Sequence, residues 1–330
     1  MLMIKEFKKL SKLSLKPINS FNYISKKFAH EKVCFFGLGN MGLPMALNLQ
    51  KSGMKVTGFD LNEKLQEEFK NQGGNIAHDM SLSIREADCI ITMLPNYLAT
   101  EMVWTNSFIH AKKRTVFIDN STISPTDAKE IGNIAKHNDF IAGICPVSGG
   151  VNGAKSGNLS FMVGSEKDHF ESVKKFLLPM GKNIFHTGDY ASGQIVKICN
   201  NLCLAISMAG LSESLALGVK LGMDPKILSE VMSASTARSW SLDSYNPVPG
   251  ILPNAPASRD YDNGYNNELM KKDLLIAEEC AKQVGLHTDL GKKVTDYYLA
   301  LNELGLQKKD FGVIYQYILA NKSDKFRNNN

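Results

Sequence analysis

A glycine-rich turn between two short apolar segments constrains the fold of this 330-residue chain more than any other feature. "FFGLGNMG" sets Gly37, Gly39 and Gly42 in GxGxxG spacing after a strand-like run, and the helical pattern "PMALNLQKSG" and the strand pattern "KVTGFD" follow it. Glycines so spaced permit a tight turn and a close approach of a pyrophosphate to the helix N-terminus. A glycine triplet alone is weak and could serve helix packing only, but this context predicts a dinucleotide site.

Asp60 ends the second predicted strand and indicates which dinucleotide binds. A carboxylate there accepts hydrogen bonds from the adenosine ribose and repels a 2′-phosphate, which favours NAD over NADP, although Lys64 nearby leaves some ambiguity. The residues predicted to hold NAD here are Asp60 and the turn residues Gly37, Leu38, Gly39, Asn40, Met41 and Gly42.

Strand and helix patterns alternate as far as Gly188, which predicts an α/β fold with an N-terminal Rossmann-type doubly wound parallel sheet. After Gly193 helical periodicity dominates, with one long helix from about Tyr190 to Leu221, another opening at Asp224-Pro225, and three more. The Pro-containing segment 244–265 is predicted to be a loop. We therefore expect an NAD-binding domain over 31–192 and an all-α C-terminal domain over 193–330, joined by the long helix and serving substrate binding and dimerisation.

The basic charge of the chain is concentrated at its start. Residues 1–30 hold seven lysines and one glutamate, more than enough to account for the net charge of +5, so the rest implies no nucleic-acid surface. A basic, serine-containing segment without a long apolar block is typical of a mitochondrial transit peptide, and the matrix is the predicted location. The alternative is a disordered basic tail, which the lack of arginine in this segment favours.

Two further observations narrow the class of protein. No run of 18 uninterrupted apolar residues occurs, so we predict no membrane span. The six cysteines are scattered and the seven histidines form no HxxxH pair, so we predict reduced, mostly buried thiols and no metal site.

Two strand ends and one glycine-rich segment are candidate ligand contacts. "TMLPN" and "IDNSTIS" end the fourth and fifth strands, where a doubly wound sheet opens its crevice, and ordinary loop chemistry is the alternative for both. "PVSGGVNGAKSGNLS" offers backbone N–H groups and a hydroxyl suited to a substrate carboxylate, and a flexible surface loop is the alternative. The residues concerned are Leu94, Pro95, Ser121 and Thr122 on the nicotinamide side, and Ser148, Gly149 and Gly150 on the carboxylate side.

Four motifs together resemble one family. "FFGLGNMGLPMALNLQKSG", "PVSGGVNGAKSGNLSFMVG", "GQIVKICNN" and "LMKKDLLIA" occur in the order and spacing of the β-hydroxyacid dehydrogenases. "RSWSLDSYNPVPG" followed by "YDNGYNNELMKKDL" is similar to the branch that oxidises 3-hydroxyisobutyrate to methylmalonate semialdehyde with NAD in valine breakdown. The resemblance implies a small 3-hydroxy acid as substrate, with Lys197 as catalytic base, Asn201 as its assistant and Lys272 closing over the cofactor.

The chain departs from the family pattern at three positions. Ile144 stands where a carboxylate usually flanks the substrate loop, Ala99 stands where relatives often carry an asparagine, and Tyr265 replaces the usual phenylalanine. The first two could change affinity, and the third keeps the aromatic ring. None removes a group that the chemistry needs.

Lys197 fits the base role on physical grounds as well. On a helix it shares a face with Asn201, four residues on, and its apolar sequence neighbours should desolvate the ammonium and depress its pKa toward neutrality. Two alternatives stay open: a related semialdehyde or glyoxylate reductase, and a non-catalytic relative that serves as an oligomerising scaffold. A 6-phosphogluconate enzyme is disfavoured, because the helical part after Gly193 is short and offers no arginine cluster for a phosphate. The apolar surface of the long helix also predicts a homo-oligomer, either a dimer or a tetramer.

Overall fold

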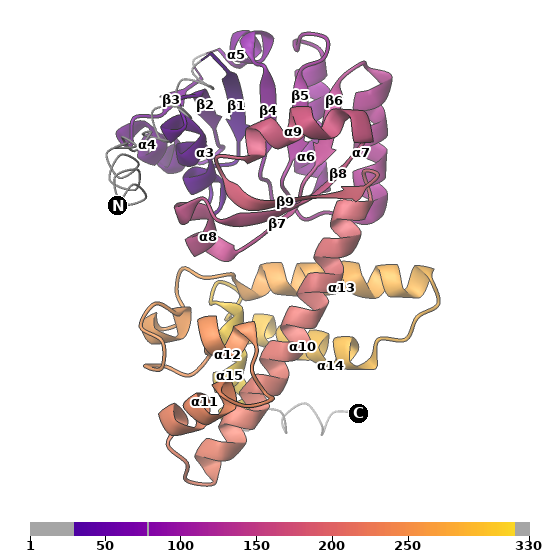
Figure 1. The fold of residues 1–330 in the computed structure, drawn as a ribbon. Coiled ribbons are helices and arrows are strands. Elements are labelled where there is room, and N and C mark those ends of the chain that lie inside the picture. The colour runs from indigo at the N-terminus through magenta and orange to yellow at the C-terminus, as the bar shows by residue number, and fades with distance from the viewer. Residues whose placement is uncertain (1–29, 78, 321–330) are drawn as a thin grey trace, which may run out of the picture.

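The computed structural model describes residues 30–77 and 79–320 of the chain (Figure 1). The predicted transit peptide, residues 1–30, lies outside the described residues except for His30. The described chain forms a sheet flanked by helices, followed by a group of helices below it, and the predicted fold class is confirmed.

Six parallel strands form the body of the sheet, in the order β3-β2-β1-β4-β5-β6. β4 and β5 are buried along their whole length, as expected of parallel strands covered by helices on both faces. The strands are β1 (Lys32–Phe36), β2 (Lys55–Phe59), β3 (Asn75–Ile76), β4 (Cys89–Thr92), β5 (Val116–Asp119) and β6 (Ile141–Ile144). The helices among them are α3 (Gly42–Lys51), α4 (Glu63–Asn71), α5 (Met80–Glu86), α6 (Tyr97–Phe108) and α7 (Pro125–His137).

The far edge of the sheet is not parallel, which corrects the expectation for this part. β8 (Leu159–Ser165) pairs antiparallel with β6 and with β7 (Val147–Ser148), and β9 (Gly181–Gly188) pairs parallel with β8. The segment expected as a glycine-rich loop contains β7 and a short helix, α8 (Gly150–Ser156). Gly149 and Gly150 have φ of 133° and 61°, so the chain reverses there and enters a helix instead of staying irregular. The 3₁₀ turn η1 (Lys167–His169) and α9 (Phe170–Leu177) complete this edge.

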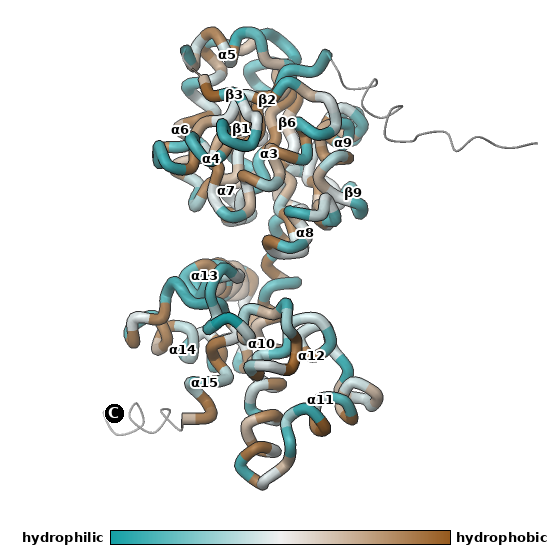
Figure 2. The backbone as a smooth tube through the Cα atoms, turned by 90° about the vertical axis from the view of Figure 1, so that its left-hand side faces the viewer, coloured by the Kyte–Doolittle hydropathy of each residue, from teal (hydrophilic) through white to brown (hydrophobic). Residues whose placement is uncertain are grey.

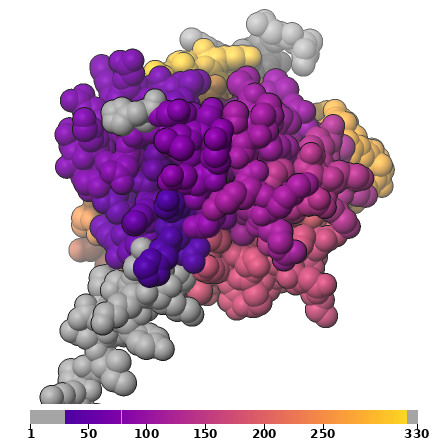
Figure 3. All heavy atoms as spheres, turned by 90° about the horizontal axis from the view of Figure 1, so that it is seen from above, coloured from indigo at the N-terminus to yellow at the C-terminus, as the bar shows by residue number. Residues whose placement is uncertain are grey.

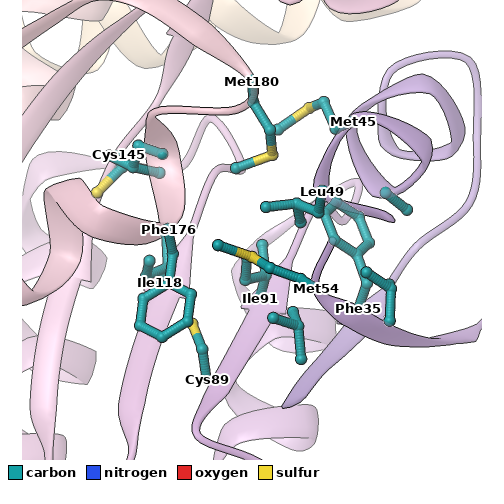
Figure 4. Packing of buried hydrophobic residues seen from close by; sticks show 14 of the residues in the cluster. Phe35, Met45, Leu49, Met54, Cys89, Ile91, Ile118, Cys145, Phe176 and Met180 are labelled. Atoms are coloured by element: carbon teal, nitrogen blue, oxygen red, sulfur yellow. The ribbon is translucent and has the colours of Figure 1, made fainter. Parts of the chain in front are cut away.

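The two faces of the sheet pack into two separate apolar cores. Along β1, Val33 and Phe35 face one core, while Cys34 and Phe36 face the other, as the alternation of a strand requires. The first core lies under α3 and α9, and the second under α5, α6 and α7. Figure 4 shows part of the first core, including Leu49, Met54, Ile91, Ile118 and Phe176.

The C-terminal helices surround one long helix, α10 (Ser192–Lys220), which leaves the sheet and runs through them (Figures 1 and 2). Viewed from above, the α/β part forms most of the visible face, and the later helices emerge at its margins (Figure 3). By length and composition α10 could cross a membrane, but it packs against the sheet and against α13, α14 and α15. The remaining elements are α11 (Pro225–Ser233), α12 (Trp240–Ser244), η2 (Pro256–Arg259), α13 (Asn267–Gln283), α14 (Asp289–Glu303), η3 (Phe311–Val313) and α15 (Ile314–Leu319).

The first turn of α10 is fastened to the sheet. A Cβ on Gly193 would lie 2.3 Å from the carbonyl oxygen of Met162, so only glycine allows this approach. Gln194, fully buried, donates from Nε2 to the carbonyl of Ser121 (2.8 Å) and accepts from the N–H of Ile123 (3.3 Å). Since Ser121 follows β5, the residues one turn further along α10 stand at the carboxyl edge of the sheet.

Candidate active site

The glycine turn has the geometry that a dinucleotide needs. Gly37 has φ of 95°, and a Cβ there would lie 2.2 Å from the carbonyl oxygen of Met93, while a Cβ on Gly42 would lie 1.8 Å from that of Gly37. Gly39 differs, because a Cβ there would meet nothing within 4 Å. No side chain of the described residues caps the start of α3, where the helix dipole favours an anion, although the N–H of Leu43 already donates to the carbonyl oxygen of Gly39 (3.0 Å). The residues present therefore fit a bound pyrophosphate.

Asp60 lies beside this turn and holds it. One carboxylate oxygen accepts from the N–H of Leu38 (2.7 Å), and the other accepts from the N–H of Asn62 (2.8 Å). Each oxygen can accept a further hydrogen bond, so the predicted contact with ribose hydroxyls remains compatible with this role. Asp60 acts on the glycine turn in the described structure, and its contact with a ribose stays a prediction.

A buried carboxylate that the sequence reasoning missed ties together the loops that follow β4 and β5. Asp119, at the end of β5, accepts on Oδ1 from the hydroxyls of Thr92 (2.7 Å), Ser121 (2.6 Å) and Thr100 (3.3 Å). Ser121 Oγ in turn accepts from the N–H of Leu94 (2.9 Å). Burial raises the pKa of Asp119, and the hydroxyl donors oppose that rise. The sequence offered one sign of this buried carboxylate: an acidic residue ends the apolar run "TVFID".

Lys272 joins those loops to the helical part. It lies on α13 and donates to the carbonyl oxygens of Thr122 (2.8 Å) and Pro95 (3.3 Å). Leu94, Pro95, Ser121, Thr122 and Lys272, predicted from separate motifs, are thus brought into one place. A cofactor contact by Lys272 itself stays a prediction.

Lys197 and Asn201 lie on one face of α10, against α13. Lys197 is 7% exposed, and burial lowers its pKa, with Asp273 opposing and Lys272 reinforcing that shift. Asn201 donates from Nδ2 to Asp273 Oδ2 (2.6 Å). This arrangement places a lysine with a depressed pKa beside an oriented amide, which is what a general base requires.

The source of that desolvation differs from the expectation. Ile195 and Val196 are 48% and 42% exposed, so they point away from the lysine, whereas Ile198 is buried. The two charged groups that act on Lys197, Asp273 and Lys272, both lie on α13, which packs on α10. Likewise Cys199 and Cys203 are exposed rather than buried, because they fall on the outer face of α10. No group of three or more His, Cys, Asp or Glu that could hold a metal occurs in residues 30–77 and 79–320.

Gly149 and Gly150 border a cavity of about 230 Å³. Its opposite wall comes from α12 and from the segment expected as a plain loop, whose residues entered the sequence analysis only as part of the resemblance and not as ligand contacts. Ser148 precedes this wall and shares no hydrogen bond with Lys197 within the described part of the chain. The lining residues are Gly149, Gly150, Val151, Asn152, Trp240, Ser244, Tyr245, Arg259, Asn263 and Gly264.

Stacked aromatic rings connect the cavity wall to the cluster formed by Lys197, Asn201 and Asp273. Tyr245 stacks on Trp240 (4.9 Å between ring centroids) and on Phe311 (5.4 Å), and Phe311 meets the ring of Tyr265 edge-on (5.8 Å). Tyr265 donates from its hydroxyl to Asp273 Oδ2. The cavity and the base are therefore neighbouring parts of one region.

Comparison with known protein families matches almost the whole described chain. Residues 32–188 match the family described as the NAD binding domain of 6-phosphogluconate dehydrogenase. Residues 191–318 match that described as the NAD-binding domain of NADP-dependent 3-hydroxyisobutyrate dehydrogenase. The boundary between the two matches falls at the start of α10.

Individual relatives are similar over most of their length. A probable mitochondrial 3-hydroxyisobutyrate dehydrogenase of Dictyostelium discoideum is 41% identical over 97% of this chain and 99% of its own. An NAD-dependent L-serine dehydrogenase of Pseudomonas aeruginosa is 38% identical over 86% of this chain and 96% of its own. The solved structure of a Mycobacterium tuberculosis 3-hydroxyisobutyrate dehydrogenase with L-serine superposes with a TM-score of 0.79, at 35% identity, over 87% of this chain and 98% of that one.

Proposed function

The chain belongs to the β-hydroxyacid dehydrogenase family, and from this premise we propose that it oxidises 3-hydroxyisobutyrate to methylmalonate semialdehyde with NAD, as in valine breakdown. The observation that carries the proposal is Lys197, a lysine 7% exposed on the same helix face as Asn201, where α10 meets the cofactor loops. A scaffold protein would have no use for a buried lysine at this place.

The proposed role of Lys197 is to take the hydroxyl proton of the substrate. Oxidation of a primary alcohol removes that proton and a hydride from the carbon, and NAD, when bound, supplies the hydride acceptor. Burial disfavours the ammonium, so Lys197 can be neutral and receive the proton, and in the reverse direction its ammonium returns it. Asn201, held by Asp273, adds an amide without adding charge. The residues proposed to hold NAD are Gly37, Leu38, Gly39, Asn40, Met41, Gly42, Asp60, Leu94, Pro95, Thr122 and Lys272.

The substrate carboxylate is assigned to Ser148, Gly149 and Gly150. Gly149 and Gly150 line the cavity, and their backbone N–H groups can donate to an anion there. The aromatic wall of Trp240 and Tyr245 is suited to the short apolar branch of the substrate.

A second candidate substrate is a 2-amino-3-hydroxy acid such as L-serine. Asp273 is 3% exposed, its Oδ1 has no hydrogen-bond partner among the described residues, and this oxygen lies 3.6 Å from the Lys272 ammonium. A substrate ammonium would satisfy that oxygen, whereas a methyl group would not. Both an L-serine enzyme and a structure with L-serine occur among the similar proteins.

A substrate panel tests the proposal. Oxidation of 3-hydroxyisobutyrate, 3-hydroxypropionate, L-serine and 4-hydroxybutyrate is measured with NAD and then with NADP. We expect the highest kcat/KM for 3-hydroxyisobutyrate with NAD, and a higher value for L-serine would favour the second candidate.

A substitution tests the role of Lys197. Lys197→Ala should reduce kcat by about 100-fold or more while NAD binding is nearly kept, with Lys220→Ala on the exposed end of α10 as control. Near-native turnover in Lys197→Ala would refute the assignment.

The finer expectations on location, domains and assembly remain proposals. The similar enzyme of Dictyostelium discoideum is named mitochondrial, which supports a transit peptide in residues 1–30 and a matrix location. We assign NAD binding to residues 31–192 and substrate binding and self-association to residues 193–330. The exposed face of α10 supports a homo-oligomer, because Ile195, Val196 and Leu217 are apolar and 42–62% exposed there.

A further inference from the structure

The hydroxyl of Tyr265 reaches Asp273 and Asn201, the two side chains that lie beside Lys197. Its oxygen lies 2.5 Å from Asp273 Oδ2 and 3.4 Å from Asn201 Nδ2. Tyr265 is half-buried, and burial, followed by the charge of Asp273, raises its pKa well above the ordinary value. The phenol therefore stays protonated and acts as a donor to the carboxylate.

Two donors converge on one oxygen of Asp273. The Tyr265 hydroxyl and the Asn201 amide both donate to Oδ2, while Oδ1 has no hydrogen-bond partner among the described residues. Because the amide of Asn201 must turn its nitrogen toward Oδ2, its oxygen faces the other way and accepts from Asn200 (3.0 Å). The orientation of Asn201 thus depends on where the carboxylate is held.

The tyrosine ring is itself fixed. It packs edge-on against Phe311, and the backbone N–H of Phe311 donates to the carbonyl of Tyr265 (2.8 Å). A phenylalanine could keep both of these contacts, so the hydroxyl is not needed to fill space or to hold the loop. Among the described residues, the hydroxyl of Tyr265 makes its hydrogen bonds with Asp273 and Asn201.

We propose that the Tyr265 hydroxyl is a positioning group that, by sharing the negative charge of Asp273, weakens the pull of this carboxylate on the Lys197 ammonium and so helps to keep the base neutral. The proposal rests on the function proposed for Lys197. Among the described residues, the charged groups that act on Lys197 are Asp273 and Lys272, both on α13. A hydrogen bond to an ionised carboxylate spreads its charge, and a less concentrated negative charge favours the lysine ammonium less.

The variant Tyr265→Phe tests this role, because it removes the hydroxyl and keeps the ring. We expect the pH profile of kcat/KM to move upward by about half a pH unit, which lowers the rate at pH 7 roughly threefold and leaves the plateau at high pH nearly unchanged. Tyr297→Phe, which removes a tyrosine–carboxylate hydrogen bond to Glu213 on the outer side of the helical part, is the matched control. An unshifted profile, or a shift to lower pH, would overturn the proposal, whatever happens to the plateau.

Two further measurements separate this inference from the proposed function. Competitive labelling of Lys197 with acetic anhydride against pH, read by peptide mass spectrometry without substrate, should show the same upward shift in Tyr265→Phe, even if no acid of the panel is oxidised. In an Asp273→Asn background the shift should vanish, since the hydroxyl acts through the carboxylate. If Tyr265→Phe folds poorly, site-specific fluorotyrosine at position 265 strengthens the donor and should shift the profile downward, and no shift there would count against the role.

Discussion

The ammonium of Lys197 lies where its charge is disfavoured, and one carboxylate moderates the effect. Burial is the largest cause of its lowered pKa, Lys272 adds to it, and Asp273 acts against it. The three side chains belong to two helices that meet side by side, so the proton affinity of the base is set by how α13 packs on α10. The pKa of Lys197 thus depends on the contact between α10 and α13.

For Lys197 we predict a rate that rises with pH. On our proposal the neutral lysine is the active base, so kcat/KM for oxidation should increase as pH rises and level off above an apparent pKa that is lower than the ordinary lysine value. Lys197→Arg should remove this limb and lower kcat about 100-fold or more, since arginine stays charged. Steady-state rates across pH 6 to 10 check the prediction, and a flat wild-type profile would contradict it.

For Asp310 we predict a contribution to the pH dependence of stability. It is 1% exposed, accepts from the hydroxyl of Tyr245 (2.8 Å), and burial raises its pKa to about 7 from 3.8. The folded state then binds the proton more tightly than the unfolded state, so the free energy of unfolding should fall as pH rises from about 4 to 7, by on the order of 3 kcal/mol.

The substitution Asp310→Asn removes this titration. Urea unfolding at several pH values should give a flatter dependence in the variant than in the wild type between pH 4 and 7. Asp262→Asn, an exposed acid of the same region, serves as the control. Parallel curves for Asp310→Asn and the wild type would show that the buried carboxyl does not titrate in this range.

Among the elements, the turn between β1 and α3 shows how three glycines in one motif serve different ends. Gly37 and Gly42 are required because backbone atoms of the protein occupy the space of a Cβ. Gly39 faces open space and is required, on our proposal, only by the ligand. The distinction is invisible in the motif itself, since all three positions read as glycine.

We therefore predict opposite outcomes for two conservative substitutions in this turn. Gly42→Ala should lower the melting temperature, because its Cβ would lie 1.8 Å from the carbonyl oxygen of Gly37. Gly39→Ala should melt near the wild-type temperature but bind NAD at least about tenfold more weakly, because the methyl takes up ligand space. Thermal melting and calorimetric titration with NAD check both, and unchanged NAD affinity in Gly39→Ala would contradict the proposed pyrophosphate site.

At the scale of the whole molecule, α10 connects the sheet to the later helices and keeps one face exposed. Its inner face packs against α13, α14 and α15, while Val196, Cys199, Cys203 and Leu217 remain exposed on the other. Exposed apolar side chains along a long helix commonly mark an interface, and a second copy of the chain is the partner we propose.

A charge on that face should weaken self-association. We predict that Leu217→Glu, at a position 62% exposed, shifts the protein toward monomer in sedimentation experiments. Leu61→Glu, at a position 91% exposed beside β2, should leave the assembly unchanged. Equal sedimentation of Leu217→Glu and the wild type would place the interface elsewhere.

The sequence by itself determined the features that depend on residues close to one another along the chain. The strand, glycine turn and helix, the acid after the second strand, the long helix and the pairing of Lys197 with Asn201 all follow from periodicity and from short-range geometry. The family assignment also rests on such local motifs, and the comparisons confirm it.

Only the tertiary structure decided which distant residues meet. Asn201 contacts Tyr265 and Asp273 from 64 and 72 positions away, and the antiparallel β8 and the wall of the cavity likewise come from segments that the sequence pattern could not bring together. Such contacts depend on how helices and strands pack, and no local pattern encodes that. For this reason the face shared by Lys197 and Asn201 was predictable from the sequence, whereas the contacts of Asn201 with Asp273 and Tyr265 were not.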